Sequence, residues 1–526
     1  MSFNLADLFE CVADVVPERT AVIAGARRFT YEDLDRRANR LAHALATRGV
    51  GPGDHVGLQL YNGPEYLEGM LAAFKIRAVP VNVNYRYVEG ELRYLFDDAD
   101  LVALVLHRVF APRVAAIAGA LPKLATFLLV EDGSGVEATL PAFDYEEMLA
   151  GQSAARAFAP RSSDDRYCLY TGGTTGMPKG VVWRHEDIFF AAMGGGDPFS
   201  TGDFIRHPEE LAARVLTPGI VALPTPPFMH ASAHWLAFHD LFCGGTIVVP
   251  EGGRFDPAEI WELVGRERVT LIVIVGDAMA RPLAEELAAH PDRYDTSSVV
   301  VIGSGGAILS PATKARLEEL LPGRMIVDGF GSSETGTLGN RTGSTFRVNE
   351  QTAVLDDRLR PVEPGSGVIG RLARRGHIPI GYYNDPEKTA ATFVEVDGVR
   401  WVLPGDLATV EADGAVTLLG RGSTSINSGG EKVFPEEVES ALKAHPAVFD
   451  VVVAGAPDER WGERVVAIVE PRPGTPPTLA ELQGFCRSRI AAYKIPRALL
   501  LVEKVRRSPA GKADYRWARE RAAAAR

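Results

Sequence analysis

Short apolar, β-prone runs alternate with helical patterns along the sequence, and this alternation constrains the fold more than any other feature. HVGLQL at 55–60 is followed by the helical pattern of 65–77 and by AVPVNVN at 78–84, and the alternation returns with LIVIVG at 271–276 and VVVIG at 299–303. Apolar strands separated by helices are typical of layered α/β structures with largely parallel sheets. We therefore predict an α/β fold.

Composition and charge exclude several classes of protein. The chain has 526 residues, of which 46% are hydrophobic and 24% charged, and this is typical of a globular protein of two or more domains. Its net charge of -12 argues against nucleic acid or an anionic membrane as the main partner. No apolar run approaches the roughly 18 residues that span a bilayer, and the N-terminus carries acids rather than the bases of a signal peptide. We expect a cytoplasmic protein without an integral membrane segment, and homodimerisation is compatible with these observations.

The four cysteines do not form a recognisable site. Cys11, Cys168, Cys243 and Cys486 lie far apart in the sequence and form no CxxC pair. This spacing is typical of reduced, structural thiols.

A domain boundary is predicted near LLGRGSTSINSGGEK at 418–432, where a β-like run gives way to small polar residues and glycines. The block that follows contains two helical and two β-like patterns, and its size suits one small α+β domain joined by a hinge-like linker. We predict a large N-terminal domain of layered α/β subdomains at 1–421 and a small, mobile α+β domain at 422–526.

The stretch YTGGTTGMPKG at 170–180 has the composition of an anion-binding loop. Its glycines let backbone N–H groups point at an anion, its threonines add hydroxyl donors, and Lys179 adds a cation. A P-loop is excluded, because Pro178 precedes the lysine and Gly180 follows it. Taken alone, such a run is more often a mobile surface loop.

Two neighbouring stretches could hold a flat base and a metal ion. In VIGSGGAILS at 301–310, Gly305 and Gly306 would allow a ligand close to the backbone. In VDGFGSSETG at 327–336 the candidate residues, with their chemical groups, are Asp328 (acceptor for an exocyclic amine), Gly329 (close approach), Phe330 (aromatic face), Ser333 (donor to a phosphate oxygen) and Glu334 (hard oxygen ligand for Mg²⁺). A tight turn with a solvated glutamate is the simpler alternative.

Three further residues lie near the predicted boundary or close to the C-terminus. Asp406 follows Pro-Gly in WVLPGDLATV and could accept two ribose hydroxyls, although an aspartate that stabilises the turn is commoner. Arg421 lies at the predicted boundary, and Lys512 follows a glycine in SPAGKADYR.

These residues, in this order, resemble the adenylate-forming superfamily of acyl-CoA synthetases, nonribosomal adenylation domains and luciferases. The resemblance covers essentially the whole chain. The family's phosphate loop reads Tyr-Thr-Ser-Gly-Thr-Thr-Gly-x-Pro-Lys-Gly, and Gly172 replaces its serine here. YTGGTTGMPKGVVW and GGEKVFPEEVE look like actinobacterial acyl-CoA synthetases that include steroid side-chain ligases.

The resemblance implies an enzyme that binds ATP, Mg²⁺ and coenzyme A. Glu334 would hold Mg²⁺ and Ser333 would contact the α-phosphate, while Lys512 would neutralise charge as a substrate carboxylate attacks the α-phosphorus. The residues implied to hold the β- and γ-phosphates are Thr171, Gly172, Gly173, Thr174, Thr175, Gly176 and Lys179. Those implied to frame adenine and ribose are Asp328, Phe330, Asp406 and Arg421.

The resemblance also implies that the C-terminal domain swings so that the coenzyme A thiol can displace AMP. Gly429, Gly430 and Lys432 of NSGGEK would border the pantetheine tunnel. The usual hinge position is Ser423 here, where many members have Asp or Lys, and this departure affects the details of the switching rather than the reaction class.

The identity of the substrate acid is the part of the function that the sequence determines least. PTPPFMHASAHWLAFHDLFCGG at 224–245 resembles the Pro-x-x-His segment that lines the acyl site in the family, so His230, Trp235 and Gly305 are candidate pocket residues. The spacing of His230 and His234 is also that of a zinc helix, but the Glu of HExxH is absent. No charge is reserved for an amino group, so we predict a fatty acid, a steroid side-chain acid or another bulky hydrophobic acid.

Three other functions are alternatives on the same fold. The acyl-adenylate could be delivered to a carrier protein instead of coenzyme A. A non-catalytic ligand binder would be expected to lack Glu334 or Lys512, and this chain has both. A luciferase-like oxygenase would need the same adenylation and would differ by consuming O2.

Overall fold

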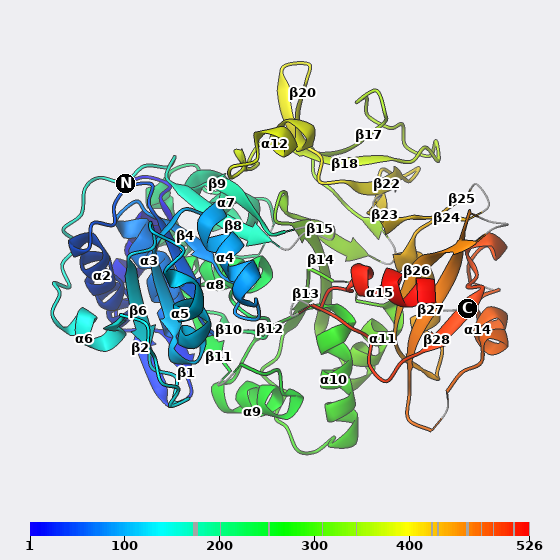
Figure 1. The fold of residues 1–526 in the computed structure, drawn as a ribbon, viewed down its shortest axis with the longest axis horizontal. Helices are drawn as coiled ribbons and strands as arrows, with labels where there is room; N and C mark the ends of the chain where they lie inside the picture. The colour runs from blue at the N-terminus through cyan, green and yellow to red at the C-terminus, as the bar shows by residue number, and fades with distance from the viewer. Residues whose placement is uncertain are drawn as a thin grey trace.

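The computed structural model describes residues 1–171, 177–199, 201–250, 253–307, 309–342, 345–421, 424–428, 431–458, 462–474, 476–487, 489–508 and 511–524. For residues 341, 342, 421, 431, 432 and 462 only the backbone is described. Two large sheets and their helices form the N-terminal part of the molecule, and a third sheet forms a separate C-terminal block (Figure 1). The α/β fold class predicted from the sequence is confirmed.

The first sheet has eight strands in the order β19-β9-β8-β4-β3-β5-β6-β7. Its strands are β3 (His55–Gln59), β4 (Val79–Asn82), β5 (Leu101–His107), β6 (Thr126–Val130), β7 (Phe143–Asp144), β8 (Arg166–Thr171), β9 (Lys179–Arg184) and β19 (Gly381–Tyr382). The strands from β8 to β7 run parallel, whereas β9 forms an antiparallel hairpin with β8 and pairs antiparallel with β19. The hairpin therefore carries the predicted phosphate loop between two strands.

The second sheet has fifteen strands in the order β2-β1-β11-β10-β12-β13-β14-β15-β16-β23-β22-β18-β21-β20, with β17 beside β18. Its first half consists of β1 (Thr20–Ala24), β2 (Arg27–Thr30), β10 (Val221–Pro224), β11 (Thr246–Val249), β12 (Leu271–Ile274), β13 (Val301–Ser304) and β14 (Met325–Ser332). Its second half consists of β15 (Gly336–Thr342), β16 (Thr345–Phe346), β17 (Thr352–Leu355), β18 (Gly370–Arg375), β20 (Phe393–Val396), β21 (Val399–Val402), β22 (Asp406–Val410) and β23 (Val416–Arg421). The pairing is parallel from β1 through β11, β10, β12 and β13 to β14, and antiparallel from β14 onward.

Helices cover both sheets of the N-terminal part. The described ones are α1 (Leu5–Val15), α2 (Tyr31–Thr47), α3 (Pro64–Lys75), α4 (Glu89–Asp98), α5 (Ala111–Ala118), α6 (Tyr145–Ala150), α7 (His185–Ala192), α8 (Ala231–Phe242), α9 (Pro257–Glu267), α10 (Gly276–Ala289), α11 (Pro311–Leu320) and α12 (Pro386–Thr392), with short 3-10 turns η1 (Arg108–Phe110), η2 (Gly194–Gly196) and η3 (Pro208–Arg214). All residues of α3 are buried, as expected of a helix enclosed on every side by neighbouring elements. Within the described ranges, no helix is long and apolar enough to cross a membrane.

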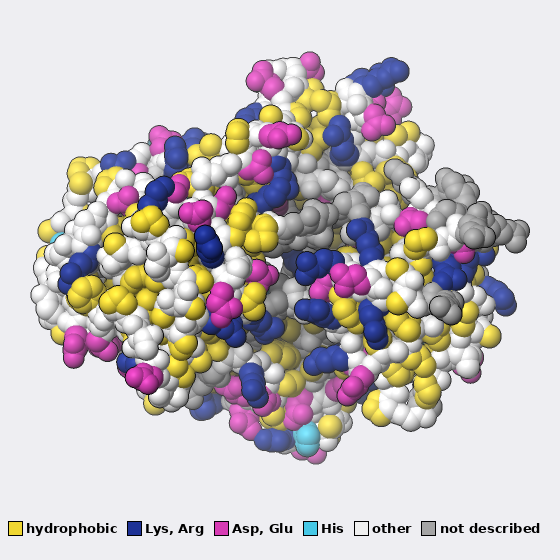
Figure 2. Space-filling view, viewed as in Figure 1, with side chains coloured by type: hydrophobic (Ala, Val, Ile, Leu, Met, Phe, Trp, Pro, Cys, Tyr) yellow, Lys and Arg dark blue, Asp and Glu magenta, His cyan; other side chains and the backbone are white. Residues whose placement is uncertain are grey.

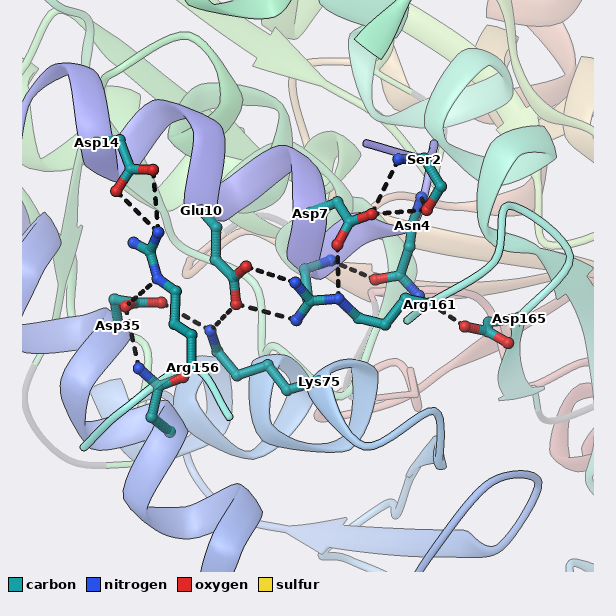
Figure 3. A network of polar contacts seen from close by, with 12 residues as sticks. Ser2, Asn4, Asp7, Glu10, Asp14, Asp35, Lys75, Arg156, Arg161 and Asp165 are labelled. Atoms are coloured by element: carbon teal, nitrogen blue, oxygen red, sulfur yellow. Dashed lines mark hydrogen bonds and ion pairs between the residues drawn. The ribbon is translucent and has the colours of Figure 1, made fainter. Parts of the chain in front are cut away.

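Burial of α3 places charged side chains in the interior, and a network of ion pairs surrounds them (Figure 3). Lys75, at the end of α3, is fully buried and donates to Glu10 of α1 at 2.5 Å and to Asp35 of α2 at 2.7 Å. Arg161 contacts Glu10 from the other side, and Arg156 contacts Asp35 at 2.9 Å. Three helices are thereby joined by paired charges rather than by apolar contacts alone.

The C-terminal block is built on a five-stranded sheet with the order β25-β24-β27-β26 and β28 beside β27. Its elements are β24 (Ile426–Ser428), β25 (Glu431–Val433), α13 (Pro435–Lys443), β26 (Val448–Asp458), β27 (Gly462–Pro471), α14 (Leu479–Cys486), η5 (Ala492–Lys494), β28 (Ala498–Leu501) and α15 (Tyr515–Ala524). Each face of this sheet has its own apolar core. The exact boundary at 421/422 stays a prediction, because residues 422–423 lie outside the described ranges.

Helix α10 is one place where the C-terminal block contacts the N-terminal part. Lys443 is buried at the end of α13, and its ammonium lies 3.3 Å from the Asp277 carboxylate. Arg472 pairs with Glu285, further along α10, at 2.7 Å. Gly511 packs against the start of the same helix, where an added Cβ would lie 3.1 Å from the Ala278 side chain. The block is thus docked with residue 512 next to the N-terminal part.

Candidate active site

The β8–β9 hairpin is anchored on both flanks of the predicted phosphate loop. Thr171 and Lys179 face each other across the hairpin. Asn82, at the end of β4, accepts from the Tyr170 N–H at 2.7 Å and donates to the carbonyls of Tyr170 and Met229, each at 2.8 Å. This one buried amide ties the strand before the loop to the residue before His230. The predicted loop residues 172–176 lie outside the described residues, so their phosphate-binding role stays a prediction.

The turn between β14 and β15 presents Ser333 and Glu334. The indole N–H of Trp183, on β9, donates to the Ser333 carbonyl at 3.0 Å. Arg374 of β18 is buried and donates to the carbonyls of Thr335 and Thr337. Its guanidinium therefore fixes the backbone that follows Glu334. Burial lowers the pKa of Arg374 to about 10.

Two lysines and two carboxylates gather around the ring of Tyr382. The Tyr382 hydroxyl donates to Glu334 Oε1 at 2.9 Å. The ammonium of Lys179 lies 5.9 Å from the centre of the ring, and that of Lys388 lies 5.1 Å from it. Asp385 pairs with Lys179 at 3.5 Å and also caps α12 by accepting from the Lys388 N–H. The hairpin, the β14–β15 turn and α12 therefore meet at one point.

This cluster suits the phosphates and metal of a nucleotide. A carboxylate oxygen is the kind of ligand that Mg²⁺ prefers, and a magnesium site usually takes one or two carboxylates together with substrate phosphates. In the ranges that the structure describes, no three His, Cys, Asp or Glu side chains gather to hold a metal. Glu334 fits a metal that is shared with a phosphate ligand, since its Oε1 is already oriented by Tyr382.

The predicted adenine residues lie together on β13 and β14. Ser304 and Asp328 are partners in the parallel pairing of these strands, and Asp328 is 5% exposed. An added Cβ at Gly305 would lie 3.7 Å from the Gly329 carbonyl, and Gly306 has a φ of +83°, which favours glycine. The Phe330 ring packs 5.2 Å from that of Phe346. These positions lie just beyond the carboxyl end of β13 and on its neighbour β14, where parallel strands usually present a ligand-binding crevice.

The predicted ribose residues are neighbours on paired strands. Asp406 begins β22 and lies opposite Arg421, the last residue of β23. A single ligand could therefore reach both positions. Glu436 of α13 approaches the same place, since an added Cβ at Gly420 would lie 2.5 Å from its Oε2. Burial and repulsion from Glu439 raise the pKa of Glu436 to about 8.

Lys512 acts electrostatically on His230, although the two residues are far apart in the sequence. Burial, reinforced by the positive charge of Lys512, lowers the pKa of His230 to about 3, so the imidazole is neutral. The turn that carries Lys512 is held by Arg507, which donates to the Gly511 carbonyl at 3.0 Å and pairs with Asp450 at 2.6 Å. Figure 2 shows a hollow between the N-terminal part and the C-terminal block, with Lys and Arg side chains along its rim.

The other residues of the predicted acyl segment pack in the interior. His234 accepts from the Tyr167 hydroxyl at Nε2 and contacts the Phe228 carbonyl through Nδ1 at 2.6 Å. The Trp235 indole N–H donates to the same hydroxyl at 3.2 Å. Both ring nitrogens of His234 are therefore engaged with protein groups. A pocket role for His230, Trp235 and Gly305 stays a prediction.

Two of the predicted coenzyme A residues, Gly429 and Gly430, and the hinge residue Ser423 lie outside the described residues. The side chains of Arg421 and Lys432 lie outside them as well. The roles of these five residues are therefore untested.

Sequence reasoning missed four residues that shape the site: Asn82, Arg374, Tyr382 and Lys388. Asn82 is one of two asparagines in the apolar run at 78–84, and a polar side chain buried in a strand requires hydrogen-bond partners. Tyr382 and Lys388 flank NDPE, whose Asp-Pro pair is a helix-start signal that could have located α12. No local signal distinguishes Arg374 from its neighbour Arg375.

Comparison with known proteins assigns the family. Residues 9–383 match the AMP-binding enzyme family, and residues 437–512 match the AMP-binding enzyme C-terminal domain. The chain therefore belongs to the AMP-binding enzymes.

Two relatives from actinobacteria are similar over nearly their whole length. A 3-oxocholest-4-en-26-oate–CoA ligase of Rhodococcus rhodochrous is 50% identical over 99% of this chain and 96% of its own. A medium/long-chain-fatty-acid–CoA/3-oxocholest-4-en-26-oate–CoA ligase of Mycobacterium marinum is 49% identical, with the same coverage of both chains.

The fold is shared with solved structures of lower sequence identity. The anthranilate CoA ligase AuaEII in complex with anthranoyl-AMP superimposes with a TM-score of 0.86 at 24% identity, covering 99% of this chain and 97% of its own. The similarity to the adenylate-forming enzymes that the sequence motifs indicated is confirmed.

Proposed function

We propose that the chain is an ATP-dependent, AMP-forming acid–CoA ligase for a bulky hydrophobic carboxylic acid. In the first step a carboxylate oxygen bonds to the α-phosphorus of ATP and pyrophosphate leaves. In the second step the coenzyme A thiol bonds to the acyl carbon of the acyl-AMP, loses its proton and displaces AMP. The observation that carries this proposal is the near 50% identity, along the whole chain, to ligases that make coenzyme A thioesters.

The roles of the site residues follow from charge and position. The attacking carboxylate is already ionised near pH 7, so the first step needs orientation and charge neutralisation rather than a general base. Lys179 would hold the departing phosphates, and Lys512 would neutralise charge on the α-phosphoryl oxygens from the other side of the hollow. Glu334 would hold Mg²⁺, which supplies charge neutralisation on the phosphates when bound.

The class of acid is proposed from the named substrates of the relatives and from the lack of a charge for an amino group in the predicted acyl segment. A steroid side-chain acid or a medium- to long-chain fatty acid meets both conditions. The alternative of an acyl-AMP ligase that loads a carrier protein is less well supported, because the two relatives are coenzyme A ligases. We also propose a cytoplasmic location, where ATP and coenzyme A are available, and homodimerisation stays a prediction.

The test is product analysis with ATP, Mg²⁺ and coenzyme A across short, medium and long fatty acids, aryl acids and 3-oxo-steroid side-chain acids. We expect AMP and acyl-CoA from one bulky hydrophobic class. Acyl-AMP without thioester would favour the carrier-loading alternative. Absence of both products with every acid would contradict the proposal.

The role of Lys512 can be separated from the second step. Lys512→Ala should slow acyl-AMP formation by about 100- to 1,000-fold, the usual cost of removing one group that stabilises transition-state charge. Thioester formation from preformed acyl-AMP should stay near the wild-type rate. Lys504→Ala, an exposed lysine on the same segment, is the matched control. Equal losses in both steps would refute the proposed alternation of the C-terminal domain between the two steps.

A further inference from the structure

Lys388 is a cation that neither the family motifs nor the comparisons assign to the site. It lies on the first turn of α12, whose N-cap is Asp385. Strand β19 brings α12 to the hairpin, because Tyr382 pairs with Val181 of β9, two residues after Lys179. Since residues two apart share a face of a strand, Lys179 and the Tyr382 ring lie on the same face.

The two ammonium groups share one aromatic ring and repel each other. Both lie within 6 Å of the centre of the Tyr382 ring, at 5.9 Å for Lys179 and 5.1 Å for Lys388. Burial and the nearby charge of Lys179 lower the pKa of Lys388 to about 8. Among the described residues, Lys179 has Asp385 within ion-pair distance, whereas no carboxylate lies that close to Lys388. Two ammonium groups held this close, of which only one has a carboxylate at ion-pair distance, are typical of an anion-binding site.

We propose that Lys388 is a second phosphate-binding residue, which together with Lys179 holds the β- and γ-phosphates of ATP and the departing pyrophosphate. This inference rests on the ATP-dependent activity proposed above. A polyphosphate has several charged oxygens, so it can accept from both ammonium groups at once and remove their mutual repulsion. Glu334 lies on the hydroxyl side of the same ring, where a metal shared with these phosphates would be held.

AMP lacks the two phosphates that Lys388 would contact, so nucleotide binding gives a direct test. Calorimetry on the full chain compares MgATP, AMP and pyrophosphate for wild type, Lys388→Gln and Lys388→Arg. We expect Lys388→Gln to weaken MgATP and pyrophosphate binding by about 10- to 100-fold, the range for one hydrogen bond to a charged group, and to leave AMP binding within about twofold. Lys388→Arg keeps the charge and should retain most of the affinity.

The matched control is Lys314→Gln, an identical change on α11, where Lys314 faces Glu318 at 4.0 Å. It should bind all three ligands as the wild type does. Equal weakening of MgATP and AMP by Lys388→Gln would indicate general distortion and overturn the proposal, as would unchanged MgATP binding. Because removing one of two repelling charges should not destabilise the chain, an unfolding midpoint well below wild type would also contradict it.

The binding test examines the role of Lys388 and the product analysis examines the proposed activity, so either one can be contradicted without the other. If wild type binds MgATP but forms no acyl-AMP from any acid, the proposed activity is wrong, and the difference between MgATP and AMP binding still decides the role of Lys388. If wild type makes acyl-CoA and Lys388→Gln binds MgATP normally, only the role of Lys388 is wrong.

Discussion

Lys75→Met tests how much the buried network of ion pairs contributes to the stability of the N-terminal part of the molecule. Methionine matches the unbranched apolar stem of lysine, with sulfur in place of the Cδ methylene, and lacks the terminal ammonium group. Lys75 has no exposed side-chain surface, and its partners Glu10 and Asp35 are 11% and 7% exposed, so solvent cannot replace the lost contacts (Figure 3). Breaking a buried ion pair from one side costs about 3–5 kcal/mol, because it leaves uncompensated charge in the interior.

The remaining contacts place this loss near the lower end of that range. Glu10 would keep Arg161 and Asp35 would keep Arg156, so each carboxylate would still have one guanidinium partner. We therefore expect the free energy of unfolding to fall by about 3 kcal/mol. Because domains of this kind are stable by only about 5–15 kcal/mol, such a loss is easily measured.

The assay is equilibrium unfolding in urea, followed by tryptophan fluorescence, with stability taken from the midpoint and slope. Lys123→Met is the control, because Lys123 forms an exposed pair with Asp100 at 2.6 Å and such pairs contribute about 0–1 kcal/mol. A loss of less than about 1 kcal/mol for Lys75→Met, equal to that of the control, would refute the reasoning.

The same network has a predictable dependence on pH. Burial alone would raise the pKa of Asp35, but attraction to Lys75 and Arg156 outweighs it and lowers the pKa from 3.8. A lowered carboxyl pKa contributes stability above the unfolded value of about 3.8, and this contribution is lost as the pH falls through the folded value. The difference between wild type and Lys75→Met should therefore shrink in acid.

Two further substitutions probe the site. Glu436 has its pKa raised from 4.5 to about 8, so its protonated form contributes stability fully below about pH 4.5, and this is lost as the pH rises through about 8. Glu436→Gln should therefore unfold at a similar temperature to wild type at about pH 4 and at an increasingly higher one up to about pH 9; parallel curves across this range would contradict the raised pKa. Arg374→Met should free the carbonyls of Thr335 and Thr337, destabilise the turn by about 1–3 kcal/mol and slow acyl-AMP formation, with partial rescue by Arg374→Lys. Acyl-AMP formation at the wild-type rate would show that Glu334 is oriented without Arg374.

Much of the fold follows from local chemistry. The apolar runs at 55–60 and 271–276 became largely buried parallel strands, because a strand covered on both faces by helices is built mainly of apolar residues. The helical pattern at 65–77 was predicted, but the burial of Glu68 and Lys75 in α3 was not, since local rules place charged side chains at the surface. Their burial depends on partners from α1, α2 and α6 that only the folded chain brings within reach.

The sequence by itself determined the class of protein, because phosphate, base and ribose recognition each leave a short motif in which glycines and fixed polar residues follow one another closely. Tertiary structure alone decided which distant residues support those motifs. Asn82 hydrogen-bonds the hairpin at Tyr170, Arg374 hydrogen-bonds the turn that carries Glu334, and Lys388 shares the Tyr382 ring with Lys179. The physical reason is that a ligand contacts several elements at once. Each supporting side chain acts through a few hydrogen bonds or one charge, and its partners are set by the packing of distant elements rather than by its neighbours in sequence.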